Sequence, residues 1–494
     1  MRLLSNLPLH DFSLTRGELR LPAWLAAFVC GLAWHAHGAA LPENTQPLPG
    51  FLRWHRAERR VDADIQGWPV RTTLERIATA TGWRVFVEPD IEGSVAARFE
   101  GRPERQALAA LLAQVNFALI PSTNGPTRLL VFREDSAKAT LPVAPAPGAK
   151  AAAAGTNVLG RELVVRLKAG SKAEAEALAK RLGARVVGAI PELNAYRLEF
   201  TDEAAAQRAR DSLANDENVA SIESNYAIGH PGQIDRLPGA GASVPPVNLR
   251  ARPFNDSSSV IVALLDTGFP GAATSHADFL LPGVTIASGA NQASASGELP
   301  HGEAMFETII QGLALGQTAT TGQAVRILPI DIYGGRSETS TFELAQGIFA
   351  GLERGADVLN LSLSSSSPSP VVEDALKQAT AAGVIAFAAS GNEPSVAPTY
   401  PAAYPNVVAV TASDRRGQIA TYANRGDFVD LIAPGTSLVP AQGDTWVVQG
   451  TSVSTAYTTG LAAGLLADSG KPASTVVGQL QSKLGFAPTP VPKP

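Results

Sequence analysis

The sequence is almost free of cysteine. Among its 494 residues only Cys30 is a cysteine, and it lies in an apolar segment near the amino terminus. Without a second thiol the chain cannot form an internal disulfide or build a thiolate metal site, and removal of that segment would also exclude a cysteine nucleophile. The folded protein must therefore be stabilised by packing alone.

Charge is also sparse, and neither sign is in large excess. Charged residues make up 17% of the chain, the formal net charge is −5, and no long run of like charge occurs. Nucleic-acid-binding domains typically carry a clear basic surplus, so DNA and RNA are not expected partners. The content of hydrophobic residues, 45%, is that of a globular protein with length for about three domains.

Long hydrophobic runs are missing too, and the one run that is typical of a targeting segment lies within residues 1–40. There Arg2, Arg16 and Arg20 precede the apolar stretch "LPAWLAAFVCGLAW", which ends in the small residues "AHGAA". This order predicts a secretory signal cut near Ala40. An uncleaved anchor is the alternative, but the run is too short to span a bilayer comfortably. The protein is expected to be exported.

Two segments without a periodic apolar face divide the rest of the chain. Residues 136–158 are rich in alanine and proline, and residues 229–247 form a second predicted linker. The folded blocks between them are residues 57–135, 159–228 and 248–490. In the last block, apolar runs such as "SVIVALLD" and "GVIAFAAS" alternate with helical patterns. This alternation predicts an α/β domain of three layers with a parallel sheet.

The first block, residues 57–135, alternates short strands with two helices and predicts a small α+β domain. Its pattern, from "PVRTTLERIATATG" to "ALAALLAQVNFALI", resembles the short N-terminal domain of secretins and TonB-dependent receptors. The resemblance implies a protein partner in the envelope and a periplasmic or outer-envelope location in a Gram-negative cell. An unrelated small α+β domain is the alternative.

The second block, residues 159–228, interleaves two helical patterns with four strand patterns, which predicts a ferredoxin-like α+β sandwich. The words "LNAYRLEF" and "DENVASIESN" resemble the propeptide inhibitor domain of subtilisin-like proteases. The resemblance implies a domain that assists folding and whose carboxyl-terminal tail occupies the active-site cleft until it is cut. A free-standing ferredoxin-like domain is the alternative.

Four polar residues of the third block stand where predicted strands end or helices begin. They are Asp266 in "VIVALLDTG", His301 in "LPHGEAM", Asn392 in "AASGNE" and Ser452 in "QGTSVSTA". Each short motif alone is weak evidence for a catalytic role. A histidine at a helix start is usually a capping residue, and Asp-Thr-Gly is also typical of aspartic proteases. Their order, together with "VLNLSLS" and "DLIAPGTSL", is similar to that of the subtilisin-like serine proteases.

This resemblance implies a role for each of the four residues. Ser452 would be the nucleophile, and His301 would be the base that accepts its proton. Asp266 would orient His301 and stabilise the imidazolium. Asn392 would donate to the developing oxyanion beside the backbone N–H of Ser452.

The resemblance also implies a cleft for polypeptide substrates. The segment "LSLS" would be a strand that pairs with an extended substrate, and "AASG" would form the opposite wall of the specificity pocket. The residues concerned are Ser362, Leu363, Ser364, Ala389, Ser390 and Gly391.

The sequence departs from the family in three places. Glu303 and Ala304 stand where Thr-His is usual after the catalytic His-Gly, which puts a carboxylate close to the predicted base. Ser364 replaces a glycine at the pocket rim, and a narrower or more polar pocket is expected. Ala456 and Tyr457 stand where Pro and His are usual, four and five residues after the nucleophile. Because alanine is a good helix former, the helix is still predicted there.

No cofactor is predicted, and no acidic cluster is specific enough to identify a calcium site, although many relatives bind calcium. The resulting hypothesis is a serine endopeptidase made as a zymogen. Its own propeptide would be an intramolecular inhibitor, removed by self-cleavage between Ile228 and Val247. The alternative is a catalytically silent envelope-binding scaffold with a subtilase fold.

Overall fold

The computed structural model describes residues 50–486, apart from 57, 121–126, 144–156, 169–171, 230–232, 237–246, 248, 254–258, 271–273, 288–297, 316–323 and 471. Residues 1–49 are not among them, so the predicted signal lies outside the described residues. In the described part of the chain, no helix is long and apolar enough to cross a membrane.

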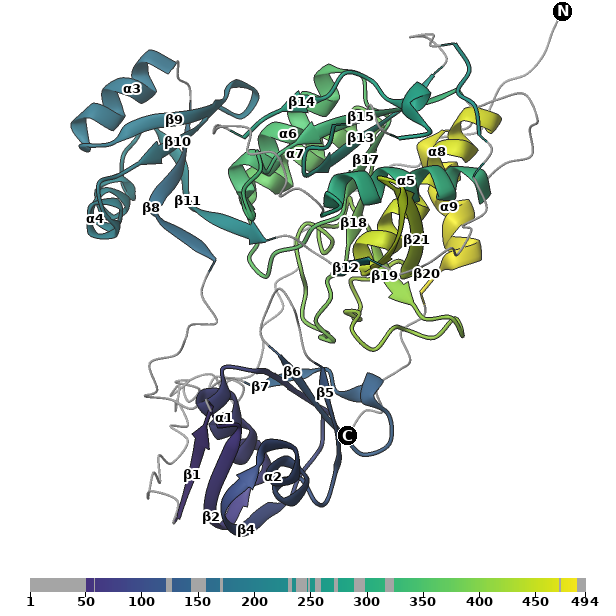
Figure 1. The fold of residues 1–494 in the computed structure, drawn as a ribbon. Coiled ribbons are helices and arrows are strands. Elements are labelled where there is room, and N and C mark those ends of the chain that lie inside the picture. The colour runs from purple at the N-terminus through teal and green to yellow at the C-terminus, as the bar shows by residue number, and fades with distance from the viewer. Residues whose placement is uncertain are drawn as a thin grey trace, which may run out of the picture. The chain divides into compact units, whose positions relative to one another are not determined.

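The first domain is built from two small sheets and two helices (Figure 1). Its helices are α1 (Val70–Thr81) and α2 (Glu104–Leu111). Its strands are β1 (Gly50–His55), β2 (Arg60–Pro69), β3 (Arg84–Val87), β4 (Ser94–Pro103), β5 (Asn116–Ile120), β6 (Arg128–Phe132) and β7 (Leu141–Val143). The sheets have the orders β1-β2-β4 and β5-β6-β3-β7. Strand β7 lies inside the segment predicted as a linker, so that prediction is wrong at this end: β7 pairs with β3 through the alternating "LPV".

The second domain has the predicted sandwich. Its elements are β8 (Val158–Leu167), α3 (Lys172–Arg181), β9 (Arg185–Ile190), β10 (Ala195–Glu199), α4 (Glu203–Leu213) and β11 (Val219–Gly229). Numbered within the domain, its strands stand in the order 4-1-3-2, because β11 pairs with β8, β8 with β10, and β10 with β9. This antiparallel order with two crossover helices is the ferredoxin-like arrangement.

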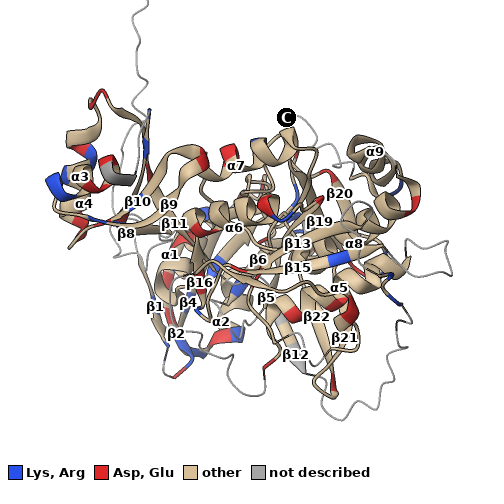
Figure 2. Ribbon diagram, turned by 90° about the horizontal axis from the view of Figure 1, so that it is seen from above, with Lys and Arg blue, Asp and Glu red and all other residues tan. Residues whose placement is uncertain are grey.

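The two faces of this second sheet are both apolar, which a domain standing alone would not need. Along β8, Leu163, Val165 and Leu167 lie in a core shared with α3 and α4. Val164, on the opposite face, belongs instead to a core shared with the third domain. The two helices carry charged residues of both signs (Figure 2), and most of the charged side chains that the structure describes on them are exposed. The second domain therefore uses its open sheet face for docking.

The second predicted linker, residues 229–247, is partly folded, and this corrects the prediction. Strand β11 continues to Gly229, and residues Gln233–Arg236 form strand β12. Gly229, at the end of β11, pairs with β16, and β12 pairs with β22. Both partner strands belong to the third domain. Because the partners are distant in sequence, a local pattern could not reveal these strands.

The third domain contains a seven-stranded parallel sheet, in the order β14-β15-β13-β17-β18-β19-β20. Its strands are β13 (Val260–Asp266), β14 (Val284–Thr285), β15 (Val325–Asp331), β17 (Val358–Leu361), β18 (Ile385–Ala389), β19 (Val408–Ser413) and β20 (Leu431–Pro434). Three further strands of the described chain lie outside this sheet, namely β16 (Glu338–Ser340), β21 (Thr436–Ala441) and β22 (Asp444–Gln449). The predicted parallel α/β fold is confirmed.

Helices cover both faces of this sheet (Figure 1). They are α5 (His301–Leu315), α6 (Thr341–Glu353), α7 (Pro370–Ala381), α8 (Thr451–Ser469) and α9 (Ala473–Leu484). The residues of β13 alternate between the layers. Ala263 and Leu265 share a core with α6 and α7, whereas Val262 and Leu264 share one with α5, α8 and α9. Burial on both faces explains why the strand reads as a continuous apolar run.

The strand order reverses at β13, and this places the site. The chain moves from β13 to β15 on one side and later to β17 on the other. Ligands of open α/β sheets bind at the carboxyl ends of strands where the order reverses. At β13 that end is Asp266.

Candidate active site

Asp266 and His301 are brought together at the carboxyl end of β13. The His301 Nδ1 atom lies 2.8 Å from Asp266 Oδ1 and 2.9 Å from Oδ2, and both side chains are buried. The backbone N–H of Thr267 also donates to Asp266 Oδ1, at 2.7 Å. A carboxylate so placed accepts the Nδ1 proton and leaves Nε2 as the acceptor of the imidazole.

The start of α5 fits closely against the turn that follows Asp266. The N–H of Gly302 donates to Thr267 Oγ1 at 2.8 Å. A Cβ atom at Gly302 would come within 2.1 Å of the Thr267 carbonyl oxygen. The glycine after the histidine is therefore required by this close approach, which sets His301 opposite Asp266. Thr267 is a positioning residue that the sequence analysis did not single out.

Ser452 belongs to the first turn of α8 and lies close to the carboxyl end of the neighbouring strand, β17. In the parallel register Leu264 is opposite Asn360, so the chain that continues to Ser362 runs beside the chain that continues to Asp266. The Ser452 hydroxyl donates to the Ser362 carbonyl at 3.1 Å. Among the described residues, His301 Nε2 is a buried nitrogen without a hydrogen-bond partner. The site thus offers an acceptor nitrogen and a serine hydroxyl, the two groups that general-base activation of a nucleophile requires.

Asn392 is held at the amino terminus of α8. Its Oδ1 accepts from the Thr451 backbone N–H at 2.8 Å and from Thr451 Oγ1 at 3.0 Å. These two hydrogen bonds fix the orientation of the Asn392 amide. Both use Oδ1, so the Nδ2 donor is not bonded to Thr451. Gly450 has a φ of 152°, and a Cβ atom there would lie 3.0 Å from Asn392 Nδ2. Thr451 is a second positioning residue that sequence reasoning missed, although it directly precedes Ser452.

Several of the residues predicted to bind substrate lie beside the start of α8. Strand β17 ends at Leu361, and Ser362–Ser364 continue the chain directly from it. Ala389 ends β18, and Ser390 and Gly391 follow it. A Cβ atom on Gly391 would lie 3.5 Å from Ser364 Oγ, which brings the two predicted pocket walls together. Their role in substrate binding stays a prediction.

The structure shows the contacts and the burial of residues that depart from the family pattern. The Glu303 carboxyl is buried, and it accepts a long hydrogen bond from Gln442 at 3.4 Å. Burial raises the pKa of this carboxyl, with a further contribution from the charge of Glu307. Tyr457 donates to Gln311 of α5 at 2.8 Å, so it ties α8 to α5. Ala456 is fully buried within α8.

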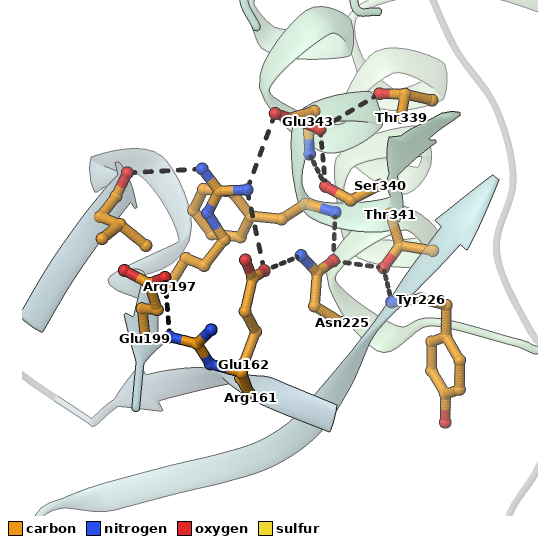
Figure 3. Close-up of polar contacts among 12 residues, drawn as sticks. Arg161, Glu162, Arg197, Glu199, Asn225, Tyr226, Thr339, Ser340, Thr341 and Glu343 are labelled. Atoms are coloured by element: carbon orange, nitrogen blue, oxygen red, sulfur yellow. Dashed lines mark hydrogen bonds and ion pairs between the residues drawn. The ribbon is translucent and has the colours of Figure 1, made fainter. Parts of the chain in front are cut away.

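The second domain docks on the third through strand β11 (Figure 3). Asn225 Oδ1 accepts from the Phe342 N–H at 3.1 Å and from Thr341 Oγ1 at 3.0 Å. The first turn of a helix has unpaired N–H groups, and a side-chain oxygen that accepts from them stabilises the helix. Glu223 serves α7 in the same way, since it accepts from the Val371 N–H at 2.9 Å and from Ser369 Oγ at 2.8 Å.

An arginine of the second domain completes this contact. In Figure 3 the Arg197 guanidinium lies between two carboxylates, Glu162 of its own domain at 3.8 Å and Glu343 of α6 at 3.6 Å. It also lies over the Phe342 ring, 5.5 Å from its centroid. Because Arg197 and Glu343 are both buried, the pair must remain together to offset the cost of desolvation.

The fold and the geometry of the site together indicate what kind of protein this is. It is an α/β protein in which an Asp–His pair and a serine at a helix start meet at the carboxyl end of a parallel sheet. Comparison with known proteins agrees, because residues 257–479 match the subtilase family and residues 144–225 match the fervidolysin N-terminal prodomain. Neither match extends to residues 57–135, so the resemblance of that block stays a prediction.

Individual relatives place the chain in that family. Subtilisin Savinase from Lederbergia lenta is 32% identical over 209 residues, which cover 42% of this chain and 76% of that protein. M-protease from Shouchella clausii (strain KSM-K16) is also 32% identical over 209 residues, but there the chain spans only 53% of the relative's length. The crystal structure of fervidolysin from Fervidobacterium pennivorans matches with 22% identity and a TM-score of 0.48, over 62% of this chain and 54% of that one. On the strength of the identity to subtilisin Savinase and of the family match, the chain belongs to the subtilase family.

Proposed function

We propose that this protein is a serine endopeptidase that hydrolyses polypeptides through Asp266, His301 and Ser452. The observation that carries the proposal is the buried Asp266–His301 pair, whose Nε2 nitrogen faces no other hydrogen-bond partner in the described part of the chain. A base oriented in this way, with a serine hydroxyl bound at the adjacent strand end, is the arrangement that nucleophilic catalysis needs.

The proposed reaction starts with attack of Ser452 Oγ on the carbonyl carbon of the substrate. His301 Nε2 accepts the hydroxyl proton and then transfers it to the leaving nitrogen, while Asp266 stabilises the imidazolium. The backbone N–H of Ser452, at the start of α8, and Asn392 Nδ2 donate to the oxyanion. Water then hydrolyses the acyl-enzyme ester and regenerates the hydroxyl.

The second domain is proposed to inhibit the enzyme until it is removed. Its strand β11 holds the start of α6 through Asn225 and the start of α7 through Glu223. The match to a subtilase prodomain supports this role. The same proposal includes export, on account of the signal-like residues 1–40. A periplasmic location and an envelope partner for residues 57–135 rest only on the sequence resemblance.

Labelling with a serine-directed fluorophosphonate tests the proposed activity. The wild type should be labelled and should hydrolyse casein, and Ser452→Ala should do neither. Ser454→Ala is the matched control: Ser454 is equally buried in the same helix, but its hydroxyl donates to the Ala433 carbonyl. A wild type that is folded but neither labelled nor active would establish the silent scaffold instead.

Deletion of residues 57–135 tests the role of the first domain. Location or target proteins should change while peptide hydrolysis remains. Loss of hydrolysis in a folded deletion protein would show that the domain serves the catalytic site and not an external partner.

A further inference from the structure

The proposed oxyanion donor, Asn392, lies on a short irregular segment that neither a helix nor a strand holds in place. Strand β18 ends at Ala389, and the chain then passes through Gly391, whose φ of 104° is rarely adopted by residues with a Cβ atom. An oxyanion donor is effective only when it is fixed before the reaction, since no reorganisation is then needed as charge develops. Contacts with another part of the chain must therefore hold the backbone of Asn392.

Asn424, from the segment between β19 and β20, binds both peptide groups that flank the Asn392 Cα atom. The peptide group before it contains the Gly391 carbonyl, which accepts from the Asn424 N–H at 2.9 Å. The peptide group after it contains the Glu393 N–H, which donates to Asn424 Oδ1 at 2.9 Å. Because the orientations of these two planar groups define the φ and ψ angles of Asn392, one residue fixes the direction in which its side chain leaves the backbone.

Asn424 is itself buried and fixed, with only 2% of its surface exposed. Its backbone carbonyl accepts from Thr411 Oγ1 at 2.5 Å and from Ser390 Oγ at 3.4 Å. A backbone N–H can only donate, so the Asn424 amide must turn its oxygen towards Glu393. A Cβ atom on Gly391 would lie 2.7 Å from Asn424 Nδ2, so the close approach of this side chain requires the glycine.

Thr451 holds the other end of the Asn392 side chain. Its N–H and its hydroxyl both donate to Asn392 Oδ1, and the same hydroxyl accepts from the Gly391 N–H at 3.2 Å. These bonds orient the amide, but they do not fix the dihedral angles of the backbone from which it projects. Thr451 and Asn424 therefore act on opposite ends of the same side chain.

We propose that Asn424 is a positioning residue for peptide hydrolysis, whose side-chain oxygen holds Asn392 where its Nδ2 donates to the oxyanion. This inference rests on the proposed peptidase activity and deepens it. Because the oxyanion forms only during the reaction, loss of the Asn424 oxygen should lower kcat and kcat/KM alike and leave KM nearly unchanged.

The size of the effect has two bounds. A misplacement of about 1 Å in an active site can cost on the order of 10²-fold in rate, so we expect kcat to fall at least about fivefold. Asn424 acts through Asn392, and the fall therefore cannot exceed the roughly 10²- to 10³-fold loss expected on removal of an oxyanion donor.

The test compares wild type with Asn424→Leu, which keeps the branched shape of the side chain and removes its acceptor. Hydrolysis of a fluorogenic peptide by the full-length protein gives kcat and KM. Active sites are counted by end-point labelling with a serine-directed fluorophosphonate, so that only folded, accessible sites enter kcat. A kcat within about twofold of the wild type, or a change in KM alone, would overturn the inference.

Asn424→Ala is measured in the same way and guards against a failure of the leucine variant to fold. It removes the same acceptor without added bulk and should give the same loss of kcat. If neither variant yields labelled protein, Asn424 is required for the fold, and its assignment as a positioning residue is overturned.

Thr411→Val is the matched control. It removes a buried hydroxyl that donates to the Asn424 carbonyl, but it leaves both hydrogen bonds from Asn424 to the peptide groups around Asn392. Its kcat should stay near that of the wild type. A loss equal to that of Asn424→Leu would show a general loosening of the segment and would overturn the role of the side-chain oxygen.

A double-mutant cycle shows whether Asn424 acts through Asn392. In an Asn392→Ala protein the donor is already absent, so the further change Asn424→Leu should alter kcat by less than about twofold. Two losses that multiply would mean that the residues act independently, and this result would also overturn the inference.

The wild type in the same experiment separates the two proposals. A labelled and active wild type whose kcat is not lowered by Asn424→Leu contradicts the inference and leaves the peptidase intact. A folded wild type that is neither labelled nor active contradicts both.

Discussion

The contact of Glu223 with α7 makes prodomain docking depend on pH. This carboxyl is buried in the docked state, where it accepts from the Val371 N–H and from Ser369 Oγ. Burial raises its pKa from the ordinary 4.5 to about 7. The charge of Asp374 raises it further, and that of Arg166 opposes the rise. Its neutral form is thus favoured by docking.

The sign and size of the effect follow from linkage. A carboxyl whose pKa is raised by docking gives the full docking affinity below pH 4.5, and affinity falls as the pH rises towards 7 and then levels off. A rise of the carboxyl pKa from 4.5 to about 7 is worth roughly 3 kcal/mol. Between pH 5 and 8 the dissociation constant of the prodomain should therefore rise on the order of 70-fold.

The assay uses the self-processed complex of prodomain and catalytic domain. Dilution series between pH 5 and 8 give the dissociation constant from the onset of hydrolysis of a fluorogenic peptide, normalised at each pH to fully released enzyme. Glu223→Gln is the matched control, because the amide oxygen can still accept from Val371 and the side chain does not titrate. Its dissociation constant should vary much less.

Two results would refute this reasoning. One is a wild-type curve parallel to that of Glu223→Gln, which would place the pH dependence elsewhere. The other is tighter docking at higher pH, which would mean that the hydrogen bonds from Val371 and Ser369 stabilise the carboxylate more than burial disfavours it.

Three further substitutions test the site and the docking contact. Asp266→Asn should lower kcat for a fluorogenic peptide about 10⁴-fold with unchanged circular dichroism, because the amide cannot hold the productive tautomer of His301; a loss under tenfold would contradict the proposed triad. Asn392→Ala should lower kcat about 10²- to 10³-fold and change KM little, and an effect on KM alone would assign it to binding. Asn225→Ala removes the oxygen that accepts from the Phe342 N–H in the first turn of α6. Such a contact is worth about 1 kcal/mol, so the dissociation constant of the prodomain should rise about fivefold in the release assay. An unchanged constant would show that β11 docks through Glu223 and the strand pairing alone.

Much of the fold could be read from the sequence because its signals are local. Parallel strands buried on both faces, such as β13, require continuous apolar runs, and the sandwich of residues 159–228 shows its alternation directly. Asp266, His301, Asn392 and Ser452 could be chosen because each stands at a strand end or helix start inside a characteristic word, and their order supports the choice.

What sequence reasoning missed depends on contacts between distant residues. Thr451 holds Asn392 across 59 positions, and Asn225 meets Phe342 across 117. No window of neighbouring residues records such pairs. Glu303 is a case of the same kind. It lies two residues after His301 in sequence, but its carboxyl accepts a hydrogen bond from Gln442, 139 positions away.

The family, the type and order of most elements and the identity of the four polar residues could be predicted from the sequence alone, because they depend on periodicity and on short motifs. Only the tertiary structure shows that the end of β11 and strand β12 pair with strands of the third domain. Strand pairing is a property of two partners, and the partners of β11 and β12 lie about 110 and 210 residues further along the chain.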